Sequence, residues 1–123
     1  MKNTMPQEIE VWYLIPALRR EIAKSLIKRH NLSQRKVADL LGVTEAAVSH
    51  YLSSKRGAGL VFPKNYTKEI AKASNRIVKD NGNAIKHLYD LCKIFKKPSI
   101  ICYIHRKYDK NIKRGCNICF SKN

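Results

Sequence analysis

The chain has 123 residues, and its 25 Lys and Arg against 9 Asp and Glu give a formal net charge of +16. This length allows one modest core with a small appended module, and it is too short for two full domains. The charge exceeds what solubility requires and favours a polyanionic partner, whereas the shortage of carboxylates and the lack of a glycine-rich phosphate loop argue against common enzyme sites.

Membrane insertion and secretion have no support in the sequence. No stretch approaches the roughly 20 apolar residues that a membrane span needs. Residues 1–7 contain no apolar run of the kind found in signal peptides. We therefore expect a cytoplasmic protein. From the lack of enzyme-site patterns noted above, we also expect that it is not an enzyme.

The first thirty residues are predicted to form one long helix. Leu18, Ile22 and Leu26 recur at helical spacing, supported by Ile15 and Ala23. Pro16 either starts this helix or bends a longer one that begins near Pro6. The apolar run at residues 11–15 is expected to pack in the core or against a second subunit.

Residues 33–53, SQRKVADLLGVTEAAVSHYLS, have the pattern of a helix-turn-helix. Ser33 and Thr44 are expected to cap its two helices, and Gly42 to supply the left-handed residue between them. The residues expected to face inward are Val37, Ala38, Leu40, Leu41, Val48, Tyr51 and Leu52.

The outer face of the second helix would then enter the major groove of DNA. Six residues are candidates for contacts with base edges: Thr44, Glu45, Ala46, Ser49, His50 and Ser53. Five flanking residues are candidates for contacts with phosphates: Gln34, Arg35, Lys36, Lys55 and Arg56. Phosphate contacts strengthen binding without conveying sequence information.

Residues 33–53 resemble the helix-turn-helix of lambda-repressor-like (XRE, Cro/CI-type) regulators. More narrowly, MPQEIEVWYLIPALRREIAKSLI followed by LSQRKVADLLGVTEAAVSHYLSSKRG resembles a family of archaeal predicted transcriptional regulators. That family also tends to have cysteines in a C-terminal tail. The resemblance implies a DNA-binding regulator with a cysteine site in the tail.

Helical periodicity resumes after the loop that ends at Pro63. Thr67 is expected to cap a helix that ends at residues 80–82, and a further helix is expected from about Asn83 to residue 97. Their inner faces are expected to consist of Ile70, Ala73, Ser74, Ile77 and Val78 in the first and of Ile85, Leu88, Tyr89, Cys92 and Phe95 in the second. His30 and His87 are expected on helix surfaces.

The C-terminal segment contains the pattern C-x2-H-x10-C-x2-C, formed by Cys102, His105, Cys116 and Cys119. A two-residue gap lets both side chains of a pair converge on one ion, so two pairs can close a tetrahedral zinc site. With Cys92 in place of His105, four thiolates make an iron–sulfur ligand set, and nearby lysines and arginines are expected to favour ionised thiols. The spacing alone favours zinc, while the archaeal resemblance favours iron–sulfur; we expect the iron–sulfur set of Cys92, Cys102, Cys116 and Cys119, with zinc as the alternative.

Other interpretations of these residues remain open. Cys92 lies on an apolar helix face and is as well explained as an inert buried thiol. His105 is also explained as a surface histidine beside Arg106. Redox-active thiols without metal are a further alternative, and disulfides are rare in a cytoplasm except in hyperthermophiles.

The sequence thus predicts an all-α fold: a lambda-repressor-like helix-turn-helix domain with additional C-terminal helices and a small cysteine-containing tail. We divide it into a DNA-binding region (1–62), helices that complete the core or a dimer interface (63–97) and a basic tail (98–123). The expected function is a homodimeric, sequence-specific regulator of transcription that binds double-stranded DNA and senses iron–sulfur, metal or redox state. The alternative is a non-specific RNA-binding or nucleoid protein with a structural zinc site.

Overall fold

The computed structural model describes residues 4–54, 59–109, 116 and 118. Within these residues every regular element is a helix and there is no strand, so the predicted all-α fold is confirmed. In chain order the elements are α1 (Pro6–Ile9), a π-helical turn η1 (Glu10–Leu14), α2 (Ile15–His30), α3 (Gln34–Leu41), α4 (Glu45–Ser53), α5 (Lys64–Lys79), α6 (Ala84–Phe95) and α7 (Pro98–Tyr108). Among the described helices, none is both long and apolar enough for a membrane span.

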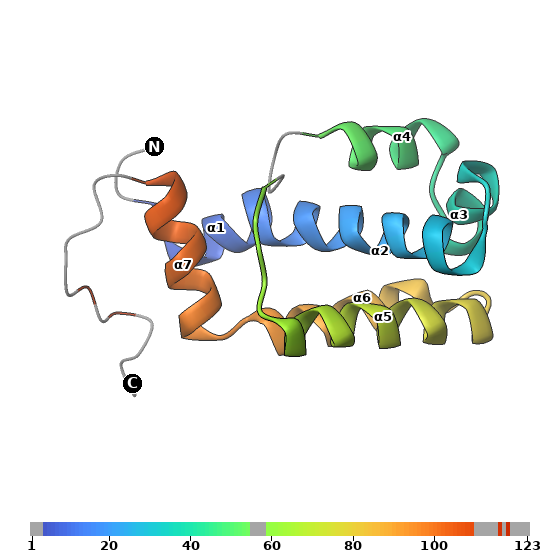
Figure 1. The fold of residues 1–123 in the computed structure, drawn as a ribbon. Helices are drawn as coiled ribbons and strands as arrows, with labels where there is room; N and C mark the ends of the chain where they lie inside the picture. Colours follow the sequence, from blue (N-terminus) through green and yellow to red (C-terminus); the bar gives the residue numbers. More distant parts are fainter. Residues whose placement is uncertain (1–3, 55–58, 110–115, 117, 119–123) are drawn as a thin grey trace.

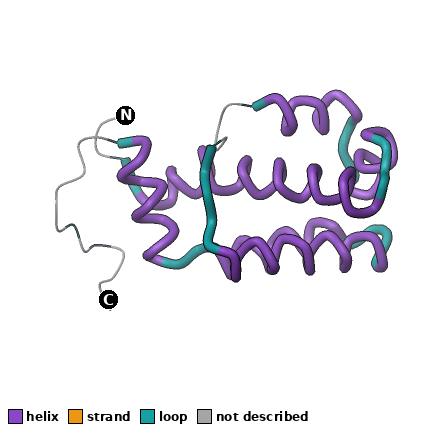
Figure 2. The backbone as a smooth tube through the Cα atoms, in the orientation of Figure 1, coloured by secondary structure: helices purple, strands orange, loops and turns teal. Residues whose placement is uncertain are grey.

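Helix α2 runs through the middle of the molecule. In Figure 1, α4 lies on one side of it and the pair α5 and α6 on the other, while α7 crosses the N-terminal end near α1. Figure 2 shows how short the loops between most of these helices are. The predicted stripe Leu18, Ile22 and Leu26 is fully buried, because α2 is covered from both sides.

Residues 6–30 form a continuous helix that is locally widened at η1. Backbone angles stay helical at both junctions, Glu10 and Leu14, and the amide of Ile15 donates to the carbonyl of Glu10, five residues back. Pro16 has no amide hydrogen to donate, so one α-helical hydrogen bond to the preceding turn is missing and that turn is wider than in a regular α-helix. Pro16 therefore lies within a longer helix that begins at Pro6, close after the π-helical turn, and does not start a separate helix.

The apolar run at residues 11–15 divides between core and surface. Leu14 is buried, and the ring of Tyr13 stacks on that of Tyr108 with centroids 3.9 Å apart. Val11 and Trp12 remain 61% and 42% exposed. Core packing thus explains only part of this cluster.

Helix α5 begins three residues before the predicted cap. Pro63 occupies the N-cap position, and its carbonyl accepts from the amide of Tyr66. Thr67 is therefore inside the helix, where its hydroxyl donates to the carbonyl of Lys64 at 2.7 Å, and the prediction that it caps the helix was wrong. The predicted inner residues Ile70, Ala73, Ser74 and Ile77 are buried and Val78 is half-buried, so the inner face is confirmed.

Helix α6 is rotated relative to the prediction. Its buried residues are Ala84, His87, Leu91 and Phe95. Ile85 and Tyr89 were expected inside and are 81% and 63% exposed, whereas Leu88 and Cys92 are half-buried.

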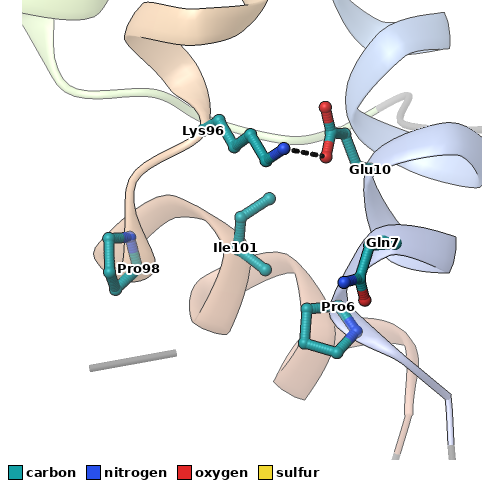
Figure 3. A pocket seen from close by; sticks show the side chains of 6 residues that line it. All are labelled: Pro6, Gln7, Glu10, Lys96, Pro98 and Ile101. Carbon is teal, nitrogen blue, oxygen red and sulfur yellow. Dashed lines mark ion pairs between the residues drawn. The ribbon is translucent and has the colours of Figure 1, made fainter. Parts of the chain in front are cut away.

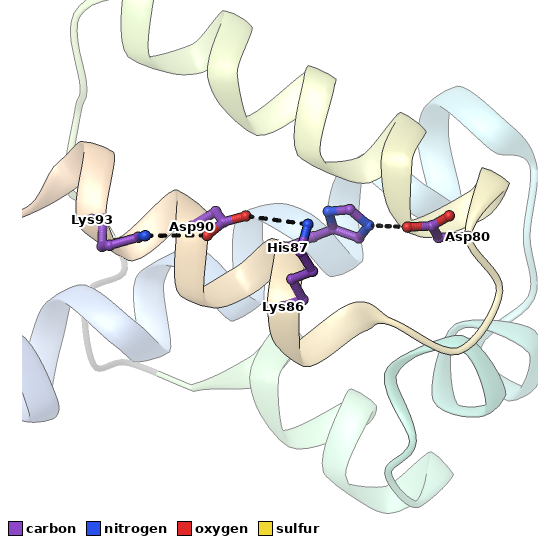
Figure 4. Close-up of polar contacts among 5 residues, drawn as sticks. All are labelled: Asp80, Lys86, His87, Asp90 and Lys93. Carbon is purple, nitrogen blue, oxygen red and sulfur yellow. Dashed lines mark hydrogen bonds and ion pairs between the residues drawn. The ribbon is translucent and has the colours of Figure 1, made fainter.

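His87 lies on the buried side of α6. Its Nε2 lies 2.8 Å from Oδ2 of Asp80, at the end of α5, so the buried ring has a polar partner (Figure 4). Lys86 and Lys93 lie at 4.0 and 3.4 Å from Asp90 on the exposed side. The expectation that His87 is a surface residue was wrong, because a hydrogen bond removes most of the cost of burying it.

The segment expected to be a tail starts with a helix of the core. Ile100, Ile101 and Ile104 of α7 are buried, and α7 packs against α1 and η1. Lys96, which precedes α7, forms an ion pair with Glu10 of η1, with 3.5 Å between Nζ and Oε2. The pair lies beside a small pocket between the N-terminal helix and the start of α7 (Figure 3). The helical core therefore continues past residue 97, to Tyr108.

Candidate nucleic-acid interface and cysteine site

Side-chain caps and one glycine hold the α3–turn–α4 unit. Ser33 Oγ accepts from the amide of Lys36, and Thr44 Oγ1 accepts from the amide of Ala47, both at 3.1 Å. Gly42, between the helices, has φ +68°, in the left-handed region that favours glycine. All three predicted roles are confirmed.

Packing and hydrogen bonds fix the inner side of α4. Val48 is fully buried, and Leu52 packs against the core. Arg20 of α2 donates hydrogen bonds from Nη1 to the carbonyls of Leu52 and Ser54, at 2.8 and 3.0 Å. The last carbonyls of any helix lack partners within that helix, so Arg20 supplies partners at the end of α4. Sequence reasoning missed Arg20, because its partners lie more than thirty residues away.

The outer side of α4 is open to solvent. All six candidates for base contacts are exposed: Thr44, Glu45, Ala46, Ser49, His50 and Ser53. Thr44 uses its oxygen for the cap, and among the described residues Ser53 makes one long bond, to the carbonyl of His50 at 3.4 Å. The outer row is thus presented on a helix whose position is fixed from behind, and its contact with bases remains a prediction.

The candidates for phosphate contacts flank this face. Gln34, Arg35 and Lys36 are exposed in the first turn of α3, where the amides at the helix N-terminus also favour anions. Lys55 and Arg56 lie outside the described residues.

The thiol of Cys92 is held in its protonated form. Burial raises its pKa from the ordinary value, and the carboxylate of Glu10 raises it further, against a smaller opposite effect of Arg19. The expectation that nearby cations favour ionised thiols was therefore wrong for Cys92. This thiol must release its proton before it can bind a metal, and the raised pKa makes that release less favourable.

Cys102 and His105 lie one turn apart on the buried face of α7. His105 was also explained as a surface residue, and that alternative was wrong, since it is 6% exposed. Its Nε2 has no hydrogen-bond partner among the described residues; the nearest carboxylate oxygen, of Asp109, is 3.8 Å away. Asp109 itself accepts hydrogen bonds from the amide and the hydroxyl of Thr4.

The remaining predicted ligands are not assembled with these two in the described part of the chain. Cys116 is half-buried, and Cys119 lies outside the described residues. Among the residues that the structure describes, no three His, Cys, Asp or Glu side chains come together as a metal site would require. The complete ligand set therefore stays a prediction.

Comparison with known proteins agrees with the geometry of α3 and α4. Residues 24–60 match the family model described as helix-turn-helix, which covers 37 of the 123 residues. Searches of curated proteins and of solved structures gave no significant match.

Proposed function

We propose that this chain is a sequence-specific regulator of transcription that binds double-stranded DNA as a homodimer; the match of residues 24–60 to the helix-turn-helix family model supports DNA as the partner. One observation carries the proposal. The outer row of α4 is exposed along its whole length, while Val48 and Arg20 fix the helix from behind. A rigid polar helix face of this kind suits the major groove, which admits one α-helix.

The charge of the chain supports the same partner. A net charge of +16 provides many cations for phosphates, and their contacts make binding strong and dependent on salt. Charge alone does not distinguish a regulator from a nucleoid or RNA-binding protein. Sequence preference does.

Selection from a library of random duplexes tests the proposal. We expect the bound fraction to converge on a palindrome whose half-sites lie about one helical turn apart. A fraction that shows no consensus, combined with a steep dependence of affinity on salt, would instead support the non-specific alternative.

A mostly apolar groove between α2 and α6 favours a second copy of the chain as a partner. Among the described residues, its lining consists of Ile15, Leu18, Arg19, Ile85, Leu88, Tyr89 and Cys92, so Arg19 is the one cation in it. Exposed Val11 and Trp12 precede Ile15 by about one turn, so they extend this surface along the same helix. A dimer holds two α4 helices on one duplex and gains affinity from simultaneous binding.

For the cysteine site, we propose zinc held by Cys102, His105, Cys116 and Cys119, with the iron–sulfur set as the alternative. Two observations favour His105 over Cys92 as the fourth ligand. The Nε2 of His105 is buried without a hydrogen-bond partner in the described part, whereas the raised pKa of Cys92 disfavours its thiolate. Loss of the ion would then release the basic C-terminal residues and alter DNA binding.

Metal content separates these ligand sets. Anaerobically purified protein is expected to be colourless, with about one zinc per chain. His105→Ala should lose the metal, and Cys92→Ala should keep it. A brown protein that loses iron in Cys92→Ala would establish the iron–sulfur set, and equal metal-free spectra for wild type and Cys116→Ser/Cys119→Ser would refute both.

A further inference from the structure

Helix α5 has a row of cations along its outer side. This cationic stripe consists of Lys64, Lys68, Lys72, Arg76 and Lys79, all of them exposed. Successive residues turn an α-helix by about 100°, so the stripe lies opposite the buried residues Ile70, Ala73, Ser74 and Ile77. The stripe therefore points away from the core.

Acidic side chains neutralise little of this stripe. Within the part of the chain that the structure describes, only Lys72 among the five has an ion pair, to Glu69 at 3.4 Å. Further cations, Lys28 and Arg29, lie off the stripe in the groove between α2 and α5, where Lys24 pairs with Glu21 at 3.9 Å. Four of the five cations of the stripe make no ion pair with the described residues, and such a surface is complementary to a polyanion.

The cationic stripe and the outer row of α4 lie on opposite sides of α2. Helix α4 packs on one side of α2 and α5 on the other, and the inner faces of both turn toward α2 (Figure 1). One straight duplex that occupies the α4 face therefore does not reach the stripe.

We propose that the cationic stripe binds the phosphates of a second DNA duplex, so that the protein bridges two DNA segments. At about 1.5 Å per residue the stripe spans roughly 22 Å, which matches six to seven phosphates of one strand at about 3.4 Å each. Binding there involves no base contacts and is independent of sequence. The surface goes beyond the regulator function and does not need an operator.

A capture assay tests this bridging. A biotinylated duplex of 40 base pairs and arbitrary sequence is fixed on beads, the full-length protein is added, and capture of a fluorescent duplex of the same sequence is measured. The stripe variant is Lys64→Gln/Lys68→Gln/Arg76→Gln. The matched control is Lys97→Gln/Lys107→Gln/Arg106→Gln, which removes the same charges from the region of α7.

We expect wild type and control to capture the second duplex, and the stripe variant to capture it at least about tenfold less. Retention of the protein on the beads should change less than about twofold, since α4 is intact. For the second duplex, the slope of log affinity against log salt concentration should become less negative by about 2.7, because three phosphate contacts are lost at about 0.9 each.

Other outcomes overturn the proposal. Capture that persists in the stripe variant would place the bridge elsewhere, for example on the two α4 helices of a dimer. Equal losses of duplex capture in the stripe variant and the control would show that capture depends on net charge and not on the stripe. Preferential displacement of the second duplex by single-stranded RNA would assign the stripe to RNA. Failure of wild type to stay on the beads would overturn the stripe itself, because its binding is independent of sequence; the regulator function is tested separately, by selection from random duplexes.

Discussion

Arg20 of α2 donates a hydrogen bond of 2.8 Å to the backbone carbonyl of Leu52, in the last turn of α4. The same Nη1 also reaches the carbonyl of Ser54. A cation at a helix C-terminus is favoured by the helix dipole, and here it ties the proposed recognition helix to the central helix. The position of α4 therefore depends on a residue outside the helix-turn-helix.

Replacing Arg20 should loosen α4 and lower affinity for DNA. Arg20→Met keeps the aliphatic stem and loses both hydrogen bonds, which should cost about 1–2 kcal/mol of unfolding free energy at this half-buried site. The control Arg29→Met, on the exposed side of α2, removes the same charge. Urea titrations that give equal midpoints for the two variants would contradict this role of Arg20.

The turn of the helix-turn-helix should depend on Gly42. A residue with a Cβ loses about 1–2 kcal/mol of folding stability at the φ of +68° found here. This cost comes from the backbone conformation alone, because an added Cβ would meet no atom of the described residues within 4 Å. Gly42→Ala is therefore expected to lower the melting temperature by several degrees, and Gly42→Asn by less, because asparagine tolerates this conformation. Equal melting temperatures for glycine and alanine at this position would show that the turn relaxes without cost.

The thiol of Cys92 should react slowly with iodoacetamide. Only thiolate reacts, and burial together with Glu10 raises the pKa of Cys92 above its ordinary value of 9.0. The folded state thus keeps a proton that the unfolded chain releases, so this thiol contributes less to stability as the pH rises through its raised pKa.

Glu10→Gln removes part of this pKa shift and should speed the alkylation of Cys92, measured for each cysteine by peptide mass spectrometry. Lys96→Met serves as the control, because Lys96 lies 3.5 Å from Glu10 and its loss leaves that carboxylate uncompensated. Alkylation in the control should not be faster than in wild type. A rate unaffected by Glu10→Gln would remove Glu10 as a cause of the shift.

The apolar surface of α2 and α6 is expected to hold the dimer together. Ile85→Glu/Tyr89→Glu places two charges on it, so light scattering at micromolar concentration should give the mass of a monomer. Val61→Glu is the control, since Val61 is 76% exposed in the loop before α5. A monomeric mass for wild type, with and without DNA, would rule out the dimer.

Local signals were sufficient to predict the helix-turn-helix. The caps at Ser33 and Thr44 and the left-handed Gly42 depend on backbone geometry within a few residues, so their sequence pattern determines them. The inner face of α2 follows in the same way from helical spacing.

The errors came from contacts between distant or competing residues. Both sides of α6 contain apolar residues, and the buried side is the one on which His87 pairs with Asp80, a contact that the spacing of apolar residues does not predict. Thr67 looked like a cap, yet Pro63 already begins α5. The bonds of Arg20 link α2 to the end of α4 across 32 residues, which no local pattern conveys.

The contact of α4 with base edges is the central claim, and selection from random duplexes with substituted protein tests it most directly. Ser49→Ala and His50→Ala should each relax the preference at one position of each half-site, because a good base contact contributes about 1–3 kcal/mol of discrimination. The control Asn65→Ala replaces an exposed side chain of α5, which packs on the other side of α2 from α4, and should return the wild-type consensus. Identical consensus sequences for wild type, Ser49→Ala and His50→Ala would contradict base recognition by α4.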